Sequence, residues 1–239
     1  MELPLVREKI EVADENAGII GHEAYVWSNH VVENQHDYIA QEVAVALVYN
    51  GISHAVMMTS PIELEAFALG FSLTEGIISH GEDIYAIDII AQDKGIEVSL
   101  TISSQSFMQL KTRRRNLTGR TGCGICGAES LEQVRPVLKV IDSNFTVSHD
   151  AINRATENLS KHQPLQVLTG AFHGAAWCDI EGNILHVCED VGRHNALDKL
   201  IGSLWLSNKQ QRTMKKQGVI KEPGFLVISS RASYEIVQK

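Results

Sequence analysis

The sequence contains no long hydrophobic run, little cysteine and no excess of positive charge. No segment approaches the roughly 18 consecutive apolar residues of a membrane-spanning helix, so we expect no membrane span. The net charge is −8, from 21 basic and 29 acidic residues, which argues against a general nucleic-acid-binding protein because neutralising phosphates takes an excess of Lys and Arg. Residues 1–7 lack the basic and apolar regions of a secretion signal, so we predict a cytoplasmic protein.

The composition is that of a folded globular protein. Hydrophobic residues make up 44% and charged residues 21%, which argues against a disordered, collagen-like or disulfide-stapled chain. At 239 residues, the chain is long enough for one large or two small domains with a sizeable core. Its four cysteines are expected to be thiols, because the predicted compartment is the cytoplasm, where disulfides are rare.

The first part of the chain alternates apolar runs with turn signals. Residues 42–49 form an apolar run that predicts a buried strand, and Asn50-Gly51 predicts a hairpin turn into a return strand at 54–58. Ser60 begins a predicted helix as the cap of a capping box, and Gly76 ends it. A second hairpin is predicted at 85–91 and 96–102, so residues 1–112 are expected to form a small ββαββ roll of the α+β class.

Residues 111–127 are rich in Arg and Gly, and we predict a mobile connector there instead of a core element. Its part 113–127 carries a C-x-x-C motif. Residues 128–239 alternate predicted strands and helices, which favours an α/β layered domain. Within it, the predicted elements are a helix capped by Ser148, extended segments at 165–168, 175–179 and 184–188, a helix at 195–206, a loop at 209–218, a strand at 225–228 and a helix at 232–239.

The C-x-x-C motif consists of Cys123 and Cys126 among four glycines. A free thiol has a pKa of roughly 8.5, and neighbouring arginines such as Arg120 and those at 113–115 lower it, giving a nucleophilic thiolate. A second thiol three residues away can relay or resolve a bound sulfur. The residues themselves indicate sulfur or disulfide exchange on a flexible segment.

Two other interpretations of the motif stay open. A C-x-x-C pair can supply half of a zinc site, but structural zinc usually has four ligands, and Cys178 and Cys188 are not a second such pair. We therefore expect no metal bound directly by the protein. A thioredoxin-like role requires the pair at a helix start after a strand, whereas here an arginine-rich segment precedes it. Cys178 and Cys188 are predicted to be buried, unreactive cross-strand neighbours.

Five stretches of the sequence resemble the formate dehydrogenase accessory sulfurtransferases, the FdhD family, in the same order along the chain. They are Arg120-Thr-Gly-Cys-Gly-Ile-Cys-Gly127, Phe67-Ala-Leu-Gly-Phe-Ser-Leu-Thr-Glu-Gly76, Thr169-Gly-Ala-Phe-His-Gly-Ala175, Glu189-Asp-Val-Gly-Arg-His-Asn-Ala-Leu-Asp-Lys199 and Ser229-Ser-Arg-Ala-Ser-Tyr-Glu235. The resemblance implies that the domain at 128–239 has a cytidine-deaminase-like α/β/α fold. It also implies that its C-terminal end is incomplete here, because the family pattern continues through a further strand and a Gly/Arg-containing segment.

The resemblance further implies a function. Such proteins take persulfide sulfur from a cysteine desulfurase and pass it to the molybdenum cofactor, in its bis(molybdopterin guanine dinucleotide) form, before the cofactor enters formate dehydrogenase. The persulfide-carrying cysteine of the family matches Cys123, and the second matches Cys126. A homodimer is compatible with the two equivalent ends of the cofactor. The alternative function is a chaperone that binds the cofactor without transferring sulfur.

A polar cluster at 190–199 predicts a ligand site at a strand-to-helix junction. Helix N-termini favour anions, so we expect Arg193, His194 and Asn195 to bind the pyrophosphate or guanine end of the cofactor. In the competing interpretation Asp190 caps the helix, and the next charged residues, Asp198 and Lys199, are solvated.

Three further residues are candidate cofactor contacts. His173 is expected either to line the cofactor pocket or to be a hydrogen-bonded core residue. Ser229 and Arg231 follow a predicted strand, where α/β sheets bind ligands, although Ser229 or Ser230 could simply cap the next helix. Ala175 stands where a zinc deaminase has its catalytic Glu, so deamination is not expected.

Overall fold

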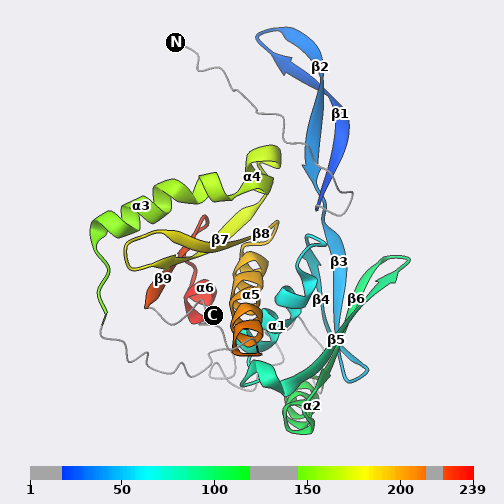
Figure 1. The fold of residues 1–239 in the computed structure, drawn as a ribbon. Helices are drawn as coiled ribbons and strands as arrows, with labels where there is room; N and C mark the ends of the chain where they lie inside the picture. The colour runs from blue at the N-terminus through cyan, green and yellow to red at the C-terminus, as the bar shows by residue number, and fades with distance from the viewer. Residues whose placement is uncertain (1–17, 119–144, 214–222) are drawn as a thin grey trace.

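The computed structural model describes residues 18–118, 145–213 and 223–239 (Figure 1). Cys123 and Cys126 lie outside these ranges. Residues 18–118 form the elements β1 (Ile19–Ser28), β2 (Val31–Ala40), β3 (Val43–Tyr49), β4 (Ile52–Thr59), α1 (Leu64–Thr74), β5 (Ile84–Gln92), β6 (Gly95–Ile102) and α2 (Ser104–Thr118), with a short 3-10 turn at Gly81–Asp83.

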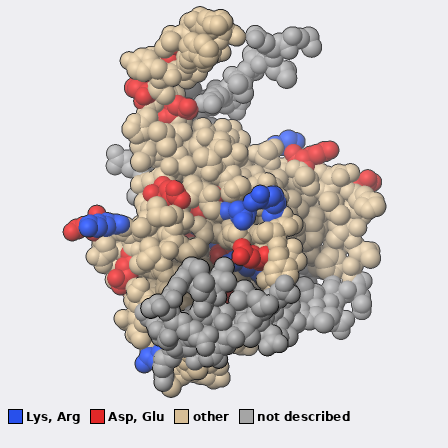
Figure 2. Space-filling model, turned by 180° about the vertical axis from the view of Figure 1, so that it is seen from behind, with Lys and Arg blue, Asp and Glu red and all other residues tan. Residues whose placement is uncertain are grey.

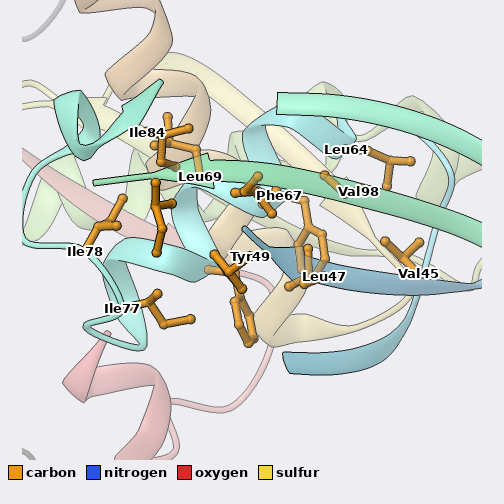
Figure 3. Close-up of a cluster of buried hydrophobic side chains, with 14 of the residues drawn as sticks. Val45, Leu47, Tyr49, Leu64, Phe67, Leu69, Ile77, Ile78, Ile84 and Val98 are labelled. Carbon is orange, nitrogen blue, oxygen red and sulfur yellow. The ribbon is translucent and has the colours of Figure 1, made fainter. Parts of the chain in front are cut away.

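The predicted ββαββ arrangement is confirmed by a four-stranded sheet. Its order is β4-β3-β6-β5, with β3 and β6 parallel at the centre and antiparallel hairpins on both sides. The alternate residues Val45, Leu47 and Tyr49 of β3 point into one core together with Phe67 of α1 and Val98 of β6 (Figure 3). Alternation along the strands and the apolar face of α1 therefore produce this core, as the sequence pattern predicts.

Two boundaries in this part differ from the prediction. Helix α1 begins at Leu64 after Glu63, which has a φ of 52° and provides no side-chain cap, so the predicted capping box at Ser60 is wrong. The predicted connector at 111–127 is wrong over its first part, because α2 continues to Thr118. The first part of the same helix is anchored by Ser106 and Leu110, which are buried, Leu110 within the core of the four-stranded sheet.

The hairpin of β1 and β2 was not predicted. Its two strands pair antiparallel from Ile19 opposite Ala40 to Ser28 opposite Val31, and the hairpin extends away from the rest of the molecule (Figure 1). Most of its side chains are exposed, including Trp27. Since neither face of the hairpin is buried over most of its length, the sequence lacks the clean apolar–polar alternation that predicts a strand.

The second part of the chain forms three layers around a smaller sheet. It contains α3 (His149–Leu159), α4 (Pro164–Thr169), β7 (His173–Asp179), β8 (Ile184–Asp190), α5 (Arg193–Thr213), β9 (Gly224–Ile228) and α6 (Tyr234–Gln238). The sheet has the antiparallel order β8-β7-β9. Helix α5 packs on one face through Leu197 and Leu200, and α3 packs on the other through Ala155 and Leu159, so the predicted α/β/α layering is confirmed.

In the second part of the chain, one local prediction is confirmed and two are wrong. Ser148 caps α3 by accepting a hydrogen bond from the backbone N–H of Ala151, as predicted. The extended segment predicted at 165–168 is instead the short helix α4, because the Glu189 carboxylate accepts hydrogen bonds from two backbone N–H groups of its first turn. Helix α5 continues to Thr213, so residues 209–213 are not part of a loop.

Helices α1 and α5 cross at very short distance and join the two parts of the chain. A Cβ at Gly70 would collide with the backbone carbonyl of Asp198, and a Cβ at Gly202 would collide with that of Ala66. Only glycine fits at either position without moving a helix. The two parts are therefore joined by the direct packing of α1 on α5.

A buried ion pair fixes this junction. Asp190 at the end of β8 and Lys199 in α5 are both fully buried, with Oδ2 and Nζ 2.7 Å apart. The same Oδ2 accepts hydrogen bonds from the Thr59 hydroxyl, the Ser60 hydroxyl and the Ser60 backbone N–H at 2.6, 2.8 and 3.0 Å. Burial alone would raise the pKa of Asp190, but the Lys199 ammonium and these donors outweigh it and hold the pKa below its usual range. Lys199 is therefore not solvated.

We expect that neutralising either member of this pair alone strongly destabilises the protein. Asp190→Asn leaves the Lys199 ammonium buried without a counter-charge, and Lys199→Met leaves the Asp190 carboxylate in the same position. Each change should lower the free energy of unfolding by about 3–5 kcal/mol. The double variant removes both charges and should recover much of that loss. Urea unfolding of both single variants and the double variant measures the coupling, and exposed Lys161→Met serves as control. Losses under about 1 kcal/mol for the single variants would contradict this role.

Candidate functional site

A cavity of about 520 Å³ lies where β4, α1, α5 and α6 meet. Its described lining residues are Met57, Met58, Phe71, Thr74, Glu75, Gly192, His194, Asn195, Asp198, Glu235, Gln238 and Lys239. The lining combines an apolar wall from β4 and α1 with polar groups from α5 and α6. Such a mixture of apolar surface and a few convergent polar groups is typical of a small-molecule site.

The junction described above also shapes one side of this cavity. Asp190 Oδ1 accepts hydrogen bonds from the Gly192 backbone N–H at 2.8 Å and from the Asn195 side-chain amide at 3.0 Å. The same amide donates to the Met58 carbonyl at 2.9 Å, which ties α5 to β4. Asp190 therefore caps the turn that leads into α5, and the side chain of Asn195 serves the fold, although the residue lines the cavity.

An acidic network forms the floor of the cavity. Asp198 is buried, with 1% exposure, and accepts hydrogen bonds from the Thr74 hydroxyl at 2.8 Å and from Lys239 Nζ at 2.8 and 2.9 Å. Lys239 Nζ also lies 3.3 Å from Glu75 Oε1. Burial raises the pKa of Asp198 to about 6, although Lys239 and Thr74 oppose that rise. Asp198 is therefore not solvated, in contrast to the simpler interpretation of the sequence.

Near α6, several polar side chains have hydrogen-bonding atoms that no other described residue of the structure satisfies. His194 Nε2 lies 3.2 Å from Glu235 Oε2, whose side chain is mostly exposed. Burial, together with neighbouring Arg193, lowers the pKa of His194, so its ring is neutral near neutral pH. Gln238 Nε2 and Arg193 Nε are buried without a hydrogen-bond partner in the structure. Buried donors of this kind are rare in folded proteins and call for a ligand or water.

The remaining predicted contacts lie elsewhere. Ser229 Oγ accepts a hydrogen bond from the Gly174 backbone N–H at 2.8 Å and so joins the end of β9 to β7. Helix α6 is capped by Ser233, not by Ser229 or Ser230. Arg231 is exposed, and His173 is half-buried on β7 opposite Asp190. None of these predicted contacts, nor Arg193, is among the described lining residues of the cavity, whereas His194 and Asn195 are.

The two described cysteines lie on opposite faces of the small sheet. Cys178 faces α3 and lies opposite Ile184, whereas Cys188 faces α5 and lies opposite Ala175, so the prediction that they are cross-strand neighbours is wrong. Both thiols are buried, as predicted. Burial raises the pKa of Cys178 to about 11 and that of Cys188 to about 12. Near neutral pH both therefore stay protonated and poorly nucleophilic.

Two features are absent from the described residues. Among residues 18–118, 145–213 and 223–239, no group of three or more His, Cys, Asp or Glu side chains is arranged to hold a metal ion. Within the same ranges, no helix combines the length and the apolar character needed to cross a membrane.

Sequence reasoning did not single out the α6 residues Glu235, Gln238 and Lys239. Glu235 lies in one of the five family-like stretches, but nothing local indicates that it faces α5 across a cavity. The only available signal was the spacing of Glu235 and Gln238, which places them on one side of a helix turn.

The raised pKa of Asp198 predicts a pH-dependent stability. The folded state retains a proton between the unfolded pKa of about 3.9 and the folded pKa of about 6. The stabilisation that this proton gives the folded state therefore falls by about 3 kcal/mol as the pH rises through that window. Relative to Asp198→Asn, the parent should therefore lose about 3 kcal/mol of unfolding free energy between about pH 4 and about pH 7. Urea unfolding at both pH values measures it, and a difference independent of pH would contradict the assignment.

Comparison with known proteins places the chain in a family. The model of the FdhD/NarQ family matches residues 40–239. The sulfur carrier protein FdhD of Acinetobacter baylyi is 51% identical over 211 residues, covering 88% of this chain and 73% of that protein. The protein of the same name from Cupriavidus necator is 51% identical over 203 residues, covering 85% of this chain and 67% of that protein.

A solved structure shows the same fold. The crystal structure of a candidate formate dehydrogenase accessory protein from Desulfotalea psychrophila superposes with a TM-score of 0.58 at 20% sequence identity, covering 92% of this chain and 76% of that chain. The fold agrees with the sequence matches, and the predicted family resemblance is confirmed. The chain belongs to the FdhD/NarQ family.

Proposed function

We propose that this protein is a sulfur carrier that moves persulfide sulfur from a cysteine desulfurase to the molybdenum cofactor used by formate dehydrogenase. Its membership of the FdhD/NarQ family supports the proposal, as does the name sulfur carrier protein borne by relatives about half identical to it. The proposal includes a cytoplasmic location, which the start of the sequence predicts.

The chemistry of the four cysteines is the observation that carries this proposal. Sulfur carriage needs a thiolate that a donor enzyme can reach. Cys178 and Cys188 are buried thiols whose raised pKa values keep them protonated. The role therefore falls to the C-x-x-C pair, Cys123 and Cys126, which lies in a Gly-rich stretch beside several arginines.

The transfer of sulfur from the desulfurase to Cys123 needs no added oxidant or reductant. The Cys123 thiolate attacks the terminal sulfur of the persulfide on the desulfurase. The sulfur–sulfur bond of the donor breaks, the donor cysteine leaves as a thiolate, and Cys123 becomes the persulfide. Cys126 supports this step as a relay or resolving thiol. In the second step an acceptor atom of the cofactor supplies the electron pair for a new bond to the terminal sulfur, the sulfur–sulfur bond on Cys123 breaks, and Cys123 leaves as a thiolate.

The cofactor, in its bis(molybdopterin guanine dinucleotide) form, is the substrate of this transfer. We propose that the cavity beside α5 holds one end of it, with His194 and Asn195 on its wall and the unpartnered amide of Gln238 pointing to a missing hydrogen-bond acceptor. His173, Arg193, Ser229 and Arg231 stay predictions as contacts for other parts of this large substrate. A homodimer would give each equivalent end of the cofactor its own cavity.

The deciding experiment is sulfur loading from a cysteine desulfurase supplied with labelled cysteine. We expect one sulfur atom added to the parent protein by intact mass, and none added to Cys123→Ala. Cys178→Ala and Cys188→Ala are the matched controls and should load as the parent does, because their thiols are buried. Labelled sulfur should then pass to the cofactor in a formate dehydrogenase activation assay.

A pure cofactor-binding chaperone is the alternative, and this experiment separates the two. The chaperone would activate formate dehydrogenase equally well with Ala at position 123 and would carry no label. Full activity of Cys123→Ala would therefore overturn the carrier function.

A further inference from the structure

The projecting hairpin of β1 and β2 has backbone edges that no other described strand uses. The two strands pair only with each other within the described ranges, so each has a second edge without a ladder partner there. Helix α4 lies against β2, and no described strand borders the outer edge of β1. A two-stranded hairpin alone is only marginally stable in water, and an edge with unpaired N–H and C=O groups accepts a further strand. The outer edge of β1 is therefore where an extended chain can add.

One face of this hairpin carries a strip of aromatic side chains. Because side chains alternate along a strand, Glu23, Tyr25 and Trp27 of β1 share one face. Tyr25 is 80% exposed and Trp27 is 68% exposed. On the same face of β2, the rings of His36 and Tyr38 meet edge to face with their centroids 5.4 Å apart. Exposed ring faces beside a carboxylate favour a cation, and the planar guanidinium of Arg above all.

The formal charges in this part of the chain have one sign. Residues 18–93 contain no Lys or Arg, whereas the hairpin carries the carboxylates of Glu23, Glu33 and Asp37. On the face that Figure 2 shows, the projecting hairpin at the top likewise carries acidic but no basic side chains. Charge of one sign attracts a partner of the opposite sign, and it disfavours the same hairpin of a second copy because like charges would then face each other. The occupant that fits this edge is therefore basic.

We propose that the outer edge of β1 binds an extended segment of a partner protein in which basic and apolar residues alternate. Added as a third strand, the segment places its basic side chains beside Glu23, Tyr25 and Trp27, where they pair with the carboxylate and stack on the rings. Its apolar side chains lie beside Ala24 and Val26, which are uncharged and half-buried on the opposite face. Main-chain hydrogen bonds supply affinity, and the alternation supplies specificity. This docking goes beyond the proposed function and does not depend on it, because no step of the sulfur transfer uses the hairpin.

The test measures, by calorimetry, the binding of short peptides with blocked ends to the full 239-residue chain. One peptide alternates Arg and Val, a second has Glu in place of every Arg, and a third has the composition of the first with its Arg residues grouped together. We expect the alternating peptide to bind at least about tenfold more tightly than either of the others, because it alone matches both the charge and the alternation. Methylating every second backbone nitrogen should abolish binding in one register only, because a strand directs alternate N–H groups to opposite sides.

Variants of the aromatic face assign the contact. The double variant Tyr25→Leu with Trp27→Leu keeps the strand apolar but removes the ring faces, so the alternating peptide should bind about tenfold more weakly. Tyr85→Leu on β5, where the tyrosine is 69% exposed, is the matched control and should bind as the parent does. Glu23→Gln leaves both rings in place and should weaken the salt dependence of binding, because it removes one charge pair. Circular dichroism checks that each variant is folded.

Four results would overturn the inference. These are equal binding of the alternating and the grouped Arg peptides, unchanged binding by the double variant, binding of both methylated registers, and no binding of any peptide. Sedimentation of the parent and of the double variant tests the competing occupant, a second copy of this chain. A dimer that dissociates only in the double variant would show that this face joins two copies, and it would contradict the docking of a partner segment.

Discussion

The buried contact between Asp190 and Lys199 determines how the two parts of the chain fit together. One oxygen of Asp190 binds Lys199 together with Thr59 and Ser60, and the other binds the turn that leads into α5. A single carboxylate thus joins the end of β4, the end of β8 and the beginning of α5. The cavity lies along these elements, so its shape depends on a buried pair that is not among its described lining residues.

Local sequence signals predict an element well where residues adjacent in the sequence determine its structure. Asn50-Gly51 forms the expected hairpin turn, and Ser148 caps α3. Ser60 carries the same local signal for a cap, but its hydroxyl is taken by Asp190, which lies 130 positions away. The helix therefore begins later, at Leu64. A capping signal cannot compete with a buried charge, because leaving that charge without donors costs more than losing one cap.

The candidate site shows the same division between local and distant causes. The strand-to-helix junction at Gly192 to Asn195 was predicted, because its glycine and polar residues follow one another in the sequence. The expectation of an anion there rested on the helix terminus alone. Glu75 at the end of α1 and Glu235 of α6 line the same cavity, and they reach it only through tertiary packing, which no window of the sequence displays.

Burial determines how reactive the cysteines and polar groups of the described interior can be. The interior raises the pKa of Cys178 and Cys188 and protonates them, which suits packing but prevents nucleophilic attack. The same burial leaves the side-chain donor of Gln238, on the wall of the cavity, without a hydrogen-bond partner. A thiol built into that wall would lose its reactivity for the same physical reason. The proposed carrier function therefore calls for a cysteine other than Cys178 and Cys188, and the sequence offers the C-x-x-C pair Cys123 and Cys126.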